Sequence, residues 1–442
     1  MRPPLLDKLR GIVGTEHLLT KVECGPYALD GRTPEAVLFP ASAEEISALL
    51  AVAAEEDLPV TPWGGGTKMA IGSPPTRVGL VLGLRRMKRL LEHEPGDLTA
   101  TAQAGITLDA LQEALGRQGQ WLSLDPPYGD RATVGGVLAA DASGPRRHLY
   151  GTARDLLIGL TVVLADGSVV RGGGKVVKNV AGYDMPKLYV GSLGTLGIIA
   201  EATVKLRPRP EADRLLLARF SRMKDCGRAV SALMASDLIP SAVELVDGEA
   251  LSALGLGGPE GGAVLAGFDG ISSQVEWQCA ELGRLLGGLG AAGSLILDGV
   301  ARDEAWRGVG EMSRRAFEEP AASMKWGVLS TQVVDLVEQA KAAAHRNGLR
   351  SAFAAHAAVG IVTAVLSGER DAVGRVVATL TEWRGLVSAS GGHARLEWAP
   401  PAVKDHVAAW DQPGPAFRIM ERLKARFDPK GILNPGRFVG GI

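Results

Sequence analysis

Four glycine-containing stretches follow one another between Asp125 and Leu206: Thr133-Val134-Gly135-Gly136-Val137, Ala142-Ser143-Gly144, Tyr150-Gly151-Thr152-Ala153-Arg154-Asp155 and Gly191-Ser192-Leu193-Gly194-Thr195-Leu196-Gly197-Ile198-Ile199. We predict that these glycines lie in short apolar strands. Glycine weakens a strand unless another backbone or a ligand approaches closely. The repetition favours one large, flat, polyanionic ligand lying along bare main chain, where N–H groups can reach its phosphates. The alternative is a glycine-rich α/β protein with tight turns, because 58 of 442 residues are glycine.

Length and composition narrow the class of protein. A chain of 442 residues is long enough for two or three domains. A formal net charge of −1 and an aromatic content of 5% argue against nucleic-acid binding. Cys24, Cys226 and Cys279 are far apart, which excludes a self-contained zinc or iron–sulfur site and fits a reducing compartment. No signal peptide and no long uncharged apolar run is visible, so we expect a cytoplasmic protein.

Local patterns predict the order of the elements. A capping box at Ser42 and Glu45 starts one helix, Thr107 caps a second, and Asp166-Gly167 marks a hairpin. A strand over 198–206 stops at Pro208-Arg209-Pro210, a predicted domain boundary. Beyond it, strands and helices alternate as in an α+β sheet covered on one face. We predict strands over 263–268 and 325–330, two strands within 351–365, and helices over 272–286, 333–346, 371–383 and 417–427.

The glycine pattern fits neither of two common nucleotide-binding motifs. A Rossmann fingerprint needs GxGxxG between a strand and a helix. Gly191, Gly194 and Gly197 are spaced GxxGxxG, and a predicted strand follows them. A Walker loop needs Ser or Thr after its GK pair, but Val176 follows Gly174-Lys175. Both folds are therefore disfavoured.

Two separate glycine regions carry a family resemblance. The first is Pro62-Trp63-Gly64-Gly65-Gly66-Thr67, and the second runs from Asp125-Pro126 through Thr133–Gly136 to Gly197-Ile198-Ile199. Together they closely resemble the FAD-binding domain of the vanillyl-alcohol oxidase / p-cresol methylhydroxylase superfamily (PCMH type). The tail Phe427-Asp428-Pro429-Lys430-Gly431-Ile432-Leu433-Asn434-Pro435-Gly436 is similar to the end of its FAD-linked oxidase branch.

The resemblance implies an α+β fold and non-covalent FAD. It implies a lead-in over 1–34, a two-subdomain PCMH-type FAD-binding domain over 35–210, and a ferredoxin-like FAD-linked oxidase C-terminal (cap) domain over 211–442 whose tail returns to the FAD side. Some members attach the flavin through His or Cys, and neither occurs in Trp63–Thr67. Residues 64–67 would hold the pyrophosphate, and Thr133, Gly135 and Gly136 would line the isoalloxazine–ribityl edge. The full implied set is Pro62, Trp63, Gly64, Gly65, Gly66, Thr67, Asp125, Pro126, Ala132, Thr133, Gly135, Gly136, Ala142, Ser143, Gly144, Tyr150, Gly197, Ile199 and Asn434.

Candidate catalytic residues come from the branch that acts on 2-hydroxy acids, to which the segment 173–184 is similar. Lys178 and Tyr183 could face the substrate, although a buried pair of Lys178 with Asp184 explains that segment equally well. Lys325 sits where relatives carry a basic residue that grips the substrate carboxylate, but a lone lysine on a strand is more often solvated. His393 is a candidate proton acceptor.

The resemblance also implies that catalytic members of this branch bind a metal ion. Their ligands are a His…Gly-Asn-x-His set and a later Glu-His pair. Here Val359, Gly360, Ile361 and Thr363 follow His356, and the later motif reads Ser390-Gly391-Gly392-His393. One imidazole at each place is too few for a metal cage. We therefore expect no metal, and we expect His356 to be a packed strand residue.

Within the family, the pattern is most similar to the second FAD-binding subunit of bacterial glycolate oxidase. That resemblance implies a related FAD-binding catalytic subunit and an iron–sulfur subunit as partners, a glycolate- or D-lactate-type substrate, and electron relay through FAD. Such a complex could also hold the chain at the inner face of a membrane. Two alternatives stay open: a self-sufficient FAD-dependent alcohol or 2-hydroxy-acid dehydrogenase using His393 and Lys325, and a non-catalytic, flavin-stabilised assembly subunit.

Overall fold

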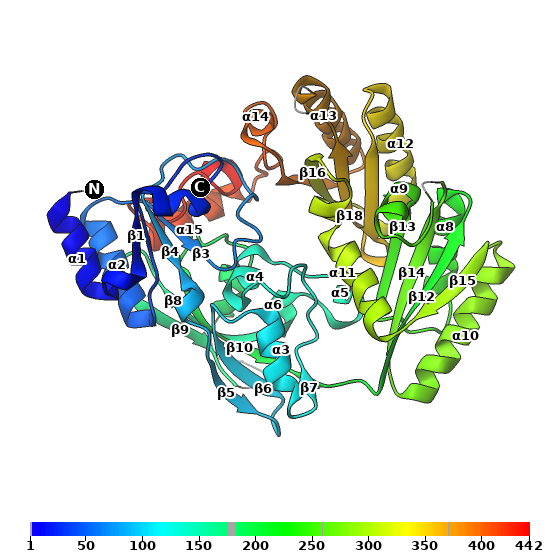
Figure 1. Ribbon diagram of the computed structural model, residues 1–442, viewed down its shortest axis with the longest axis horizontal. Helices are drawn as coiled ribbons and strands as arrows, with labels where there is room; N and C mark the ends of the chain where they lie inside the picture. The colour runs from blue at the N-terminus through cyan, green and yellow to red at the C-terminus, as the bar shows by residue number, and fades with distance from the viewer. Residues whose placement is uncertain (1, 176–182, 259, 370–371) are drawn as a thin grey trace. The chain divides into compact units, whose positions relative to one another are not determined.

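The chain folds as two units that interleave along the sequence (Figure 1). The computed structural model describes residues 2–175, 183–258, 260–369 and 372–442. The first unit contains Met1–Ser143, Thr152–Pro208 and Gln412–Ile442. The second contains Gly144–Gly151 and Arg209–Asp411. The main chain thus enters the second unit twice: it does so at Gly144, returning at Thr152, and again at Arg209, returning at Gln412.

The first unit begins with a small sheet in the order β1-β2-β4-β3. Its strands are β1 (Leu18–Thr20), β2 (Ala36–Leu38), β3 (Val60–Trp63) and β4 (Leu80–Gly83). Helices α1 (Pro3–Val13) and α2 (Ala43–Glu55) pack on each other, and their apolar faces are buried in the same core as the strands. The Ser42 hydroxyl accepts the Glu45 N–H at 3.2 Å, which confirms the predicted start of α2.

The second sheet of this unit is antiparallel, in the order β5-β6-β10-β8-β9. Its strands are β5 (Leu90–Glu94), β6 (Thr99–Gln103), β8 (Leu157–Val163), β9 (Val169–Gly173) and β10 (Ile198–Lys205). Strands β8 and β9 form the predicted hairpin, and β10 confirms the strand predicted before the proline boundary. Helix α3 (Leu108–Gly116) starts at Thr107, whose hydroxyl accepts the Ala110 N–H at 3.4 Å, as predicted.

The prediction that the glycine stretches form strands is wrong. Thr133 caps helix α4 (Val134–Ala140) by accepting the Gly136 N–H at 3.3 Å, so Gly135 and Gly136 lie in a first helical turn. The short helices α5 (Arg147–Tyr150) and α6 (Ala153–Leu156) follow. Gly191 and Gly194 take φ values of 78° and 72° in turns before β10. A short apolar run with glycines does not distinguish these conformations by its period alone.

The second unit is built on one antiparallel sheet in the order β15-β12-β14-β13-β17-β18-β16-β19 (Figure 1). Its strands are β12 (Ala212–Phe220), β13 (Ala242–Asp247), β14 (Gly262–Gly270), β15 (Gly293–Leu297), β16 (Pro320–Gly327), β17 (Ser351–His356), β18 (Ile361–Ser367) and β19 (His393–Trp398). The strand predicted over 325–330 therefore starts earlier and ends at Gly327, before the 3-10 turn Ser330–Gln332.

Helices cover both faces of this sheet, which corrects the prediction of one covered face. Leu216 of β12 shares a core with α8 (Met223–Met234), α10 (Ser272–Gly288), α12 (Val333–Arg346) and α13 (Val373–Ala389). Its neighbours Leu215 and Leu217 lie in a second hydrophobic core, together with α9 (Gly248–Ala253) and α11 (Gly299–Arg315). Successive side chains of β12 point to opposite faces of the sheet and are therefore buried in two different cores.

The chain ends back in the first unit. Helix α15 (Phe417–Phe427), with the predicted bounds, leads into a tail that pairs beside β3. The Val60 N–H donates to the Ile432 carbonyl at 2.7 Å, and the Asn434 N–H donates to the Val60 carbonyl at 2.8 Å. Among the described residues, no helix has the length and apolar character needed to cross a membrane.

Candidate functional site

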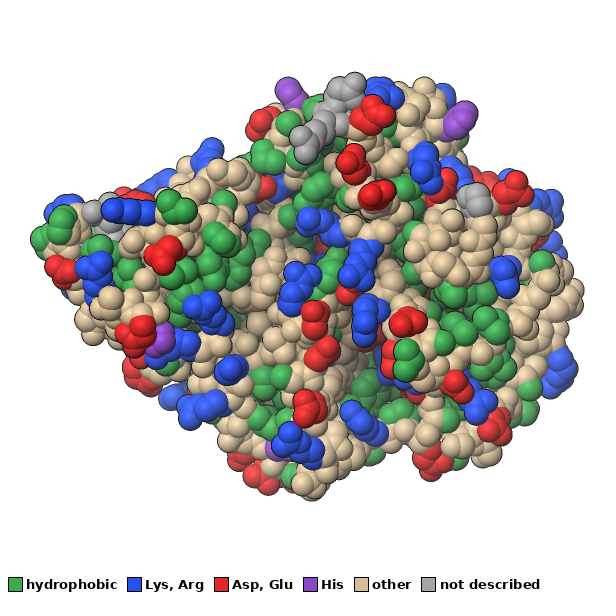
Figure 2. Space-filling view, in the orientation of Figure 1, with side chains coloured by type: hydrophobic (Ala, Val, Ile, Leu, Met, Phe, Trp, Pro, Cys, Tyr) green, Lys and Arg blue, Asp and Glu red, His purple; other side chains and the backbone are tan. Residues whose placement is uncertain are grey.

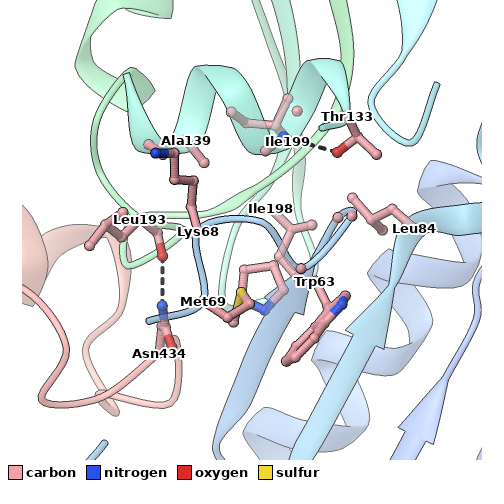
Figure 3. Close-up of a pocket in the computed structure, with 18 of the residues that line it drawn as sticks. Trp63, Lys68, Met69, Leu84, Thr133, Ala139, Leu193, Ile198, Ile199 and Asn434 are labelled. Carbon is pink, nitrogen blue, oxygen red and sulfur yellow. Dashed lines mark hydrogen bonds between the residues drawn. The ribbon is translucent and has the colours of Figure 1, made fainter. Parts of the chain in front are cut away.

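A pocket lies in the first unit where four chain segments meet, with Leu84 as a further lining residue (Figure 3). They are the end of β3 with its following loop, helix α4 with its cap, the turn before β10, and the C-terminal tail. Its lining consists of Pro62, Trp63, Gly64, Gly65, Gly66, Thr67, Lys68, Met69, Ile71, Leu84, Thr133, Gly135, Gly136, Ala139, Ala140, Leu193, Gly194, Gly197, Ile198, Ile199, Asn434 and Arg437.

The loop after β3 presents bare main chain to this pocket. Within the part of the chain that the structure describes, the N–H groups of Gly65, Gly66 and Thr67 donate to no protein acceptor. Gly66 has a φ of 74°, so successive N–H groups turn into a concave surface of the kind that binds anions. Such groups fit the pyrophosphate of a dinucleotide.

Close packing around the loop explains why positions 64 and 65 are glycine. A Cβ on Gly65 would lie 1.7 Å from the Arg131 carbonyl oxygen, and one on Gly64 would lie 2.3 Å from Thr133 Oγ1. Both contacts are too short for any side chain. The loop is thereby held against the segment that caps α4.

Helix α4 forms the facing wall. A Cβ on Gly135 would lie 2.6 Å from that of Ala104, so Gly135 lets the helix approach the main chain beside β6. At Gly136 only Thr133 Oγ1 lies within contact range, at 3.1 Å. The Lys68 side chain extends across the pocket toward Ala139 (Figure 3).

Asn434 joins the tail to two walls of the pocket. Its Nδ2 donates to the Leu193 carbonyl at 2.7 Å (Figure 3), and its Oδ1 accepts from the Thr61 hydroxyl at 3.3 Å. Its φ of 46° lies in the left-handed region, which asparagine tolerates better than most residues. The predicted Asn434 thus lines the pocket and also fixes the turn before β10.

Arg437 holds the loop after β3 in place through buried hydrogen bonds. We did not predict Arg437 as a site residue. Its side chain is 2% exposed, and it donates to the carbonyls of Met69 and Ile71, each at 2.6 Å. It also pairs with Asp30 at 3.3 Å. Burial lowers the pKa of Arg437, and the Asp30 carboxylate opposes that shift. The buried guanidinium therefore ties the loop to the last turn of the tail.

Lys424 and Asp428 secure the start of the tail. Lys424 Nζ pairs with Asp428 at 2.7 Å and donates to the carbonyls of Thr195 and Leu433, each at 2.9 Å. Asp428 also accepts the Ile432 and Leu433 N–H groups, at 3.0 and 2.7 Å. Burial lowers the pKa of Lys424, while Asp428 favours its charged form. This buried pair sets the tail beside both the pocket turn and β3.

The structure brings together most of the predicted cofactor residues. Those on the pocket are Pro62, Trp63, Gly64, Gly65, Gly66, Thr67, Thr133, Gly135, Gly136, Gly197, Ile199 and Asn434. Predicted residues away from its lining are Asp125, Pro126, Ala132, Ala142, Ser143, Gly144 and Tyr150. Ser143 accepts the Ala153 N–H at 3.2 Å, and Tyr150, in the second unit, donates to Asp269.

The predicted catalytic residues are divided between the two units, with Tyr183 in the first and Lys325 and His393 in the second. Lys178 lies outside the described residues. The Tyr183 side chain is 91% exposed, and His393 is 89% exposed with its Nδ1 3.7 Å from Asp411. Lys325 is half-buried on β16 in the second unit.

His356, predicted to be a packed residue, lies at the end of β17 in a buried polar cluster of the second unit. Its Nδ1 is 2.6 Å from Glu244 Oε1, and both side chains are buried. Burial lowers the pKa of His356 well below its usual value, and the positive charges of Lys325 and Arg147 lower it further. The imidazole is therefore neutral near pH 7.

The candidate metal ligands in the second unit do not match the metal site implied by the family resemblance. His356 has one carboxylate neighbour, and no group of three His, Cys, Asp or Glu side chains suited to a metal ion occurs among the described residues. A divalent ion beside His356 and Glu244 would therefore have too few protein ligands.

Comparison with known proteins agrees with this geometry. Residues 34–173 match the family model described as "FAD binding domain", and residues 209–438 match "FAD linked oxidases, C-terminal domain". Glycolate oxidase subunit GlcD of Bacillus subtilis is 32% identical over 421 residues, which cover 91% of this chain and 88% of that protein. A D-lactate dehydrogenase of Archaeoglobus fulgidus is 32% identical over 415 residues, 91% of each.

Solved structures share the fold. p-Cresol methylhydroxylase with substrate bound superposes with a TM-score of 0.77 at 17% identity, covering 98% of this chain and 96% of that one. An alkyldihydroxyacetonephosphate synthase has a TM-score of 0.77 at 19% identity, covering 99% and 86%. These likenesses and the two matched domains confirm the predicted fold class.

Proposed function

The chain belongs to the FAD-linked oxidases and is an FAD-dependent oxidoreductase, and from this premise we propose that it oxidises a 2-hydroxy acid such as glycolate or D-lactate as one subunit of a larger dehydrogenase. The observation that carries the proposal is the pocket, where the main-chain N–H groups of the glycine loop, Lys68 and the buried tail line one cradle. Relatives named glycolate oxidase subunit and D-lactate dehydrogenase support the substrate class.

The chain's own residues would hold FAD as follows. When bound, FAD accepts two electrons from the substrate. Gly65, Gly66 and Thr67 would donate to the pyrophosphate, and the α4 wall at Gly135 and Gly136 would border the ribityl and ring system. We also propose residues 35–210 as the FAD-binding domain and 211–442 as the cap domain with its returning tail.

The polar cluster around His356 supports a carboxylate site. Lys325 and Arg147 both act electrostatically on His356, so two positive charges lie near one neutral imidazole. A substrate carboxylate would be held by such cations. Glu244 orients the neutral His356 imidazole beside these cations.

Electron transfer onward is proposed to need an iron–sulfur partner and a related FAD-binding catalytic subunit. Support comes from the sequence, because the His…Gly-Asn-x-His set and the later Glu-His pair that the resemblance implies for catalytic members are absent here. Glycolate oxidase relatives are themselves named as subunits. The cysteines of this chain are separate and buried, and they do not form a cluster-binding motif.

Anaerobic spectroscopy of the FAD-loaded chain tests the proposal. We expect glycolate or D-lactate alone to bleach the flavin band slowly, and photoreduced flavin to be reoxidised by a [4Fe–4S] ferredoxin. Rapid bleaching by substrate alone would support a self-sufficient enzyme instead. A photoreduced flavin that no acceptor reoxidises would support a non-catalytic assembly subunit.

A further inference from the structure

Strand β15 forms one edge of the eight-stranded sheet and is open to solvent. Within the described residues it pairs only with β12, in the register Leu215–Leu297 to Arg219–Gly293. Leu295 and Ile296 are 44% and 46% exposed. Because Leu295 lies opposite Leu217 and Ile296 opposite Leu216, their side chains extend the two cores toward the edge.

This edge lacks the features that normally prevent strand-to-strand association. Natural edge strands carry charges or proline. The opposite edge, β19, carries His393, Arg395 and Glu397. In contrast, β15 reads Gly-Ser-Leu-Ile-Leu, and residues 285–297 contain no charged side chain.

The apolar surface continues beside the strand. Helix α10 packs against β15, and its Trp277 is 51% exposed, while Ile271 just before it is 59% exposed. Val300, shortly after β15, is 73% exposed. Figure 2 shows hydrophobic side chains at the surface over this part of the second unit. An exposed strand edge flanked by large apolar side chains is typical of an interaction site.

We propose that β15 pairs with β15 of a second copy of this chain, antiparallel across a twofold axis. The register that pairs all five residues sets Leu295 opposite its own copy and Gly293 opposite Leu297. It places Asp298 opposite Ala292, so no like charges face each other. The uncharged strand is therefore compatible with itself.

A twofold pairing also closes the assembly. The β15 edges of the two copies pair with each other, so no β15 edge is left for a third copy to bind. Among the described edge strands, β5, β9, β11 (Arg207–Pro208) and β19 carry charges, and β3 carries Pro62. Strand β1 and the two-residue β7 (Gln120–Trp121) are short and largely covered. A head-to-tail contact would thus lack a second unguarded edge. The pairing does not depend on the substrate or on the proposed function.

Light scattering of the FAD-loaded chain tests the pairing. We expect a mass of twice 46.2 kDa that falls to the single-chain mass on dilution. Leu295→Lys alone and Leu295→Glu alone place like charges opposite each other, so each is expected to be monomeric. An equal mixture of the two variants is expected to recover the dimer, because opposite charges then meet.

Controls separate edge pairing from misfolding. Both variants should retain bound FAD, and Val169→Lys, at a 39% exposed position of edge strand β9, should remain dimeric. A wild-type chain that is monomeric at all concentrations would overturn the proposal and leave the edge to a different protein. Dimeric Leu295→Lys, or a variant mixture that stays monomeric, would overturn it as well.

Discussion

The guanidinium of Arg437 donates a hydrogen bond to the carbonyl of Met69 at 2.6 Å, across most of the length of the chain. This contact joins the last turn of the tail to the loop that presents free N–H groups at the pocket. The geometry of the loop therefore depends on residues that follow the whole second unit in sequence.

Replacing Arg437 should weaken FAD binding. Arg437→Met leaves Asp30 and two carbonyls without their buried donor, and a hydrogen bond to a charged group contributes about 1.5–3 kcal/mol. We expect the Kd for FAD, measured by flavin fluorescence quenching, to rise roughly tenfold or more. Arg426→Met, on the exposed face of α15, is the matched control and should bind FAD normally. Equal affinities in the two variants would contradict the role of Arg437.

Asn434 should be more sensitive to alanine than to glycine. Both substitutions remove the hydrogen bond to Leu193, but only alanine also meets the left-handed backbone at φ 46°. We expect Asn434→Ala to lower the free energy of unfolding by about 1 kcal/mol more than Asn434→Gly. Urea unfolding of both variants provides the measurement. The reverse order would show that the backbone conformation is not the constraint.

A single methyl group on Gly65 should disrupt the cradle. The added Cβ would meet the Arg131 carbonyl at 1.7 Å, so the loop must move. We expect Gly65→Ala to lose stoichiometric FAD and to be destabilised by more than about 2 kcal/mol. Gly25→Ala, whose Cβ would meet nothing within 4 Å, serves as the control. Full FAD occupancy in Gly65→Ala would mean that the loop is not held against that carbonyl.

Lys325 should affect substrate binding more than turnover. If it holds the carboxylate, Lys325→Met raises KM for the 2-hydroxy acid by about tenfold with a smaller change in kcat. Steady-state kinetics in the assembled enzyme would show this split. Lys224→Met, at an exposed position of α8, should leave both constants unchanged. An unchanged KM in Lys325→Met would remove Lys325 from the carboxylate site.

Acidification should destabilise the fold partly through His356. Its pKa is lowered in the folded state, so below about pH 6.5 the unfolded chain binds a proton that the folded chain excludes. Stability is therefore expected to fall as the pH drops below that value, until the folded pKa is reached. His356→Gln should show a shallower slope of unfolding free energy against pH between 5 and 7, by up to about 1.4 kcal/mol per pH unit for one group. Parallel slopes in both proteins would contradict the buried neutral imidazole.

Local sequence signals predicted the elements whose ends are fixed locally. Helices α12 and α15 have the predicted bounds, and the caps at Ser42 and Thr107 form as expected. The glycine stretches were predicted wrongly as strands, because alternation over five residues does not reveal that Thr133 is a helix cap. The loop and tail glycines still pointed to the right pocket, since they resemble a family whose backbone surrounds its cofactor.

Long-range contacts could not be predicted from the sequence. Arg437 stands at the end of the C-terminal tail, yet its partners Met69 and Ile71 are more than three hundred residues away. Lys424 likewise reaches Thr195 across the second unit's sequence. Leu84 and Ile71 line the pocket as ordinary apolar residues, and no motif marks them.

The most direct test is reconstitution of the purified chain with FAD, followed by removal of free cofactor and an absorbance spectrum. We predict a yellow protein with one FAD per chain, released intact when the protein is denatured by heat. A protein that remains colourless after reconstitution would contradict the central claim that these backbone amides hold a dinucleotide.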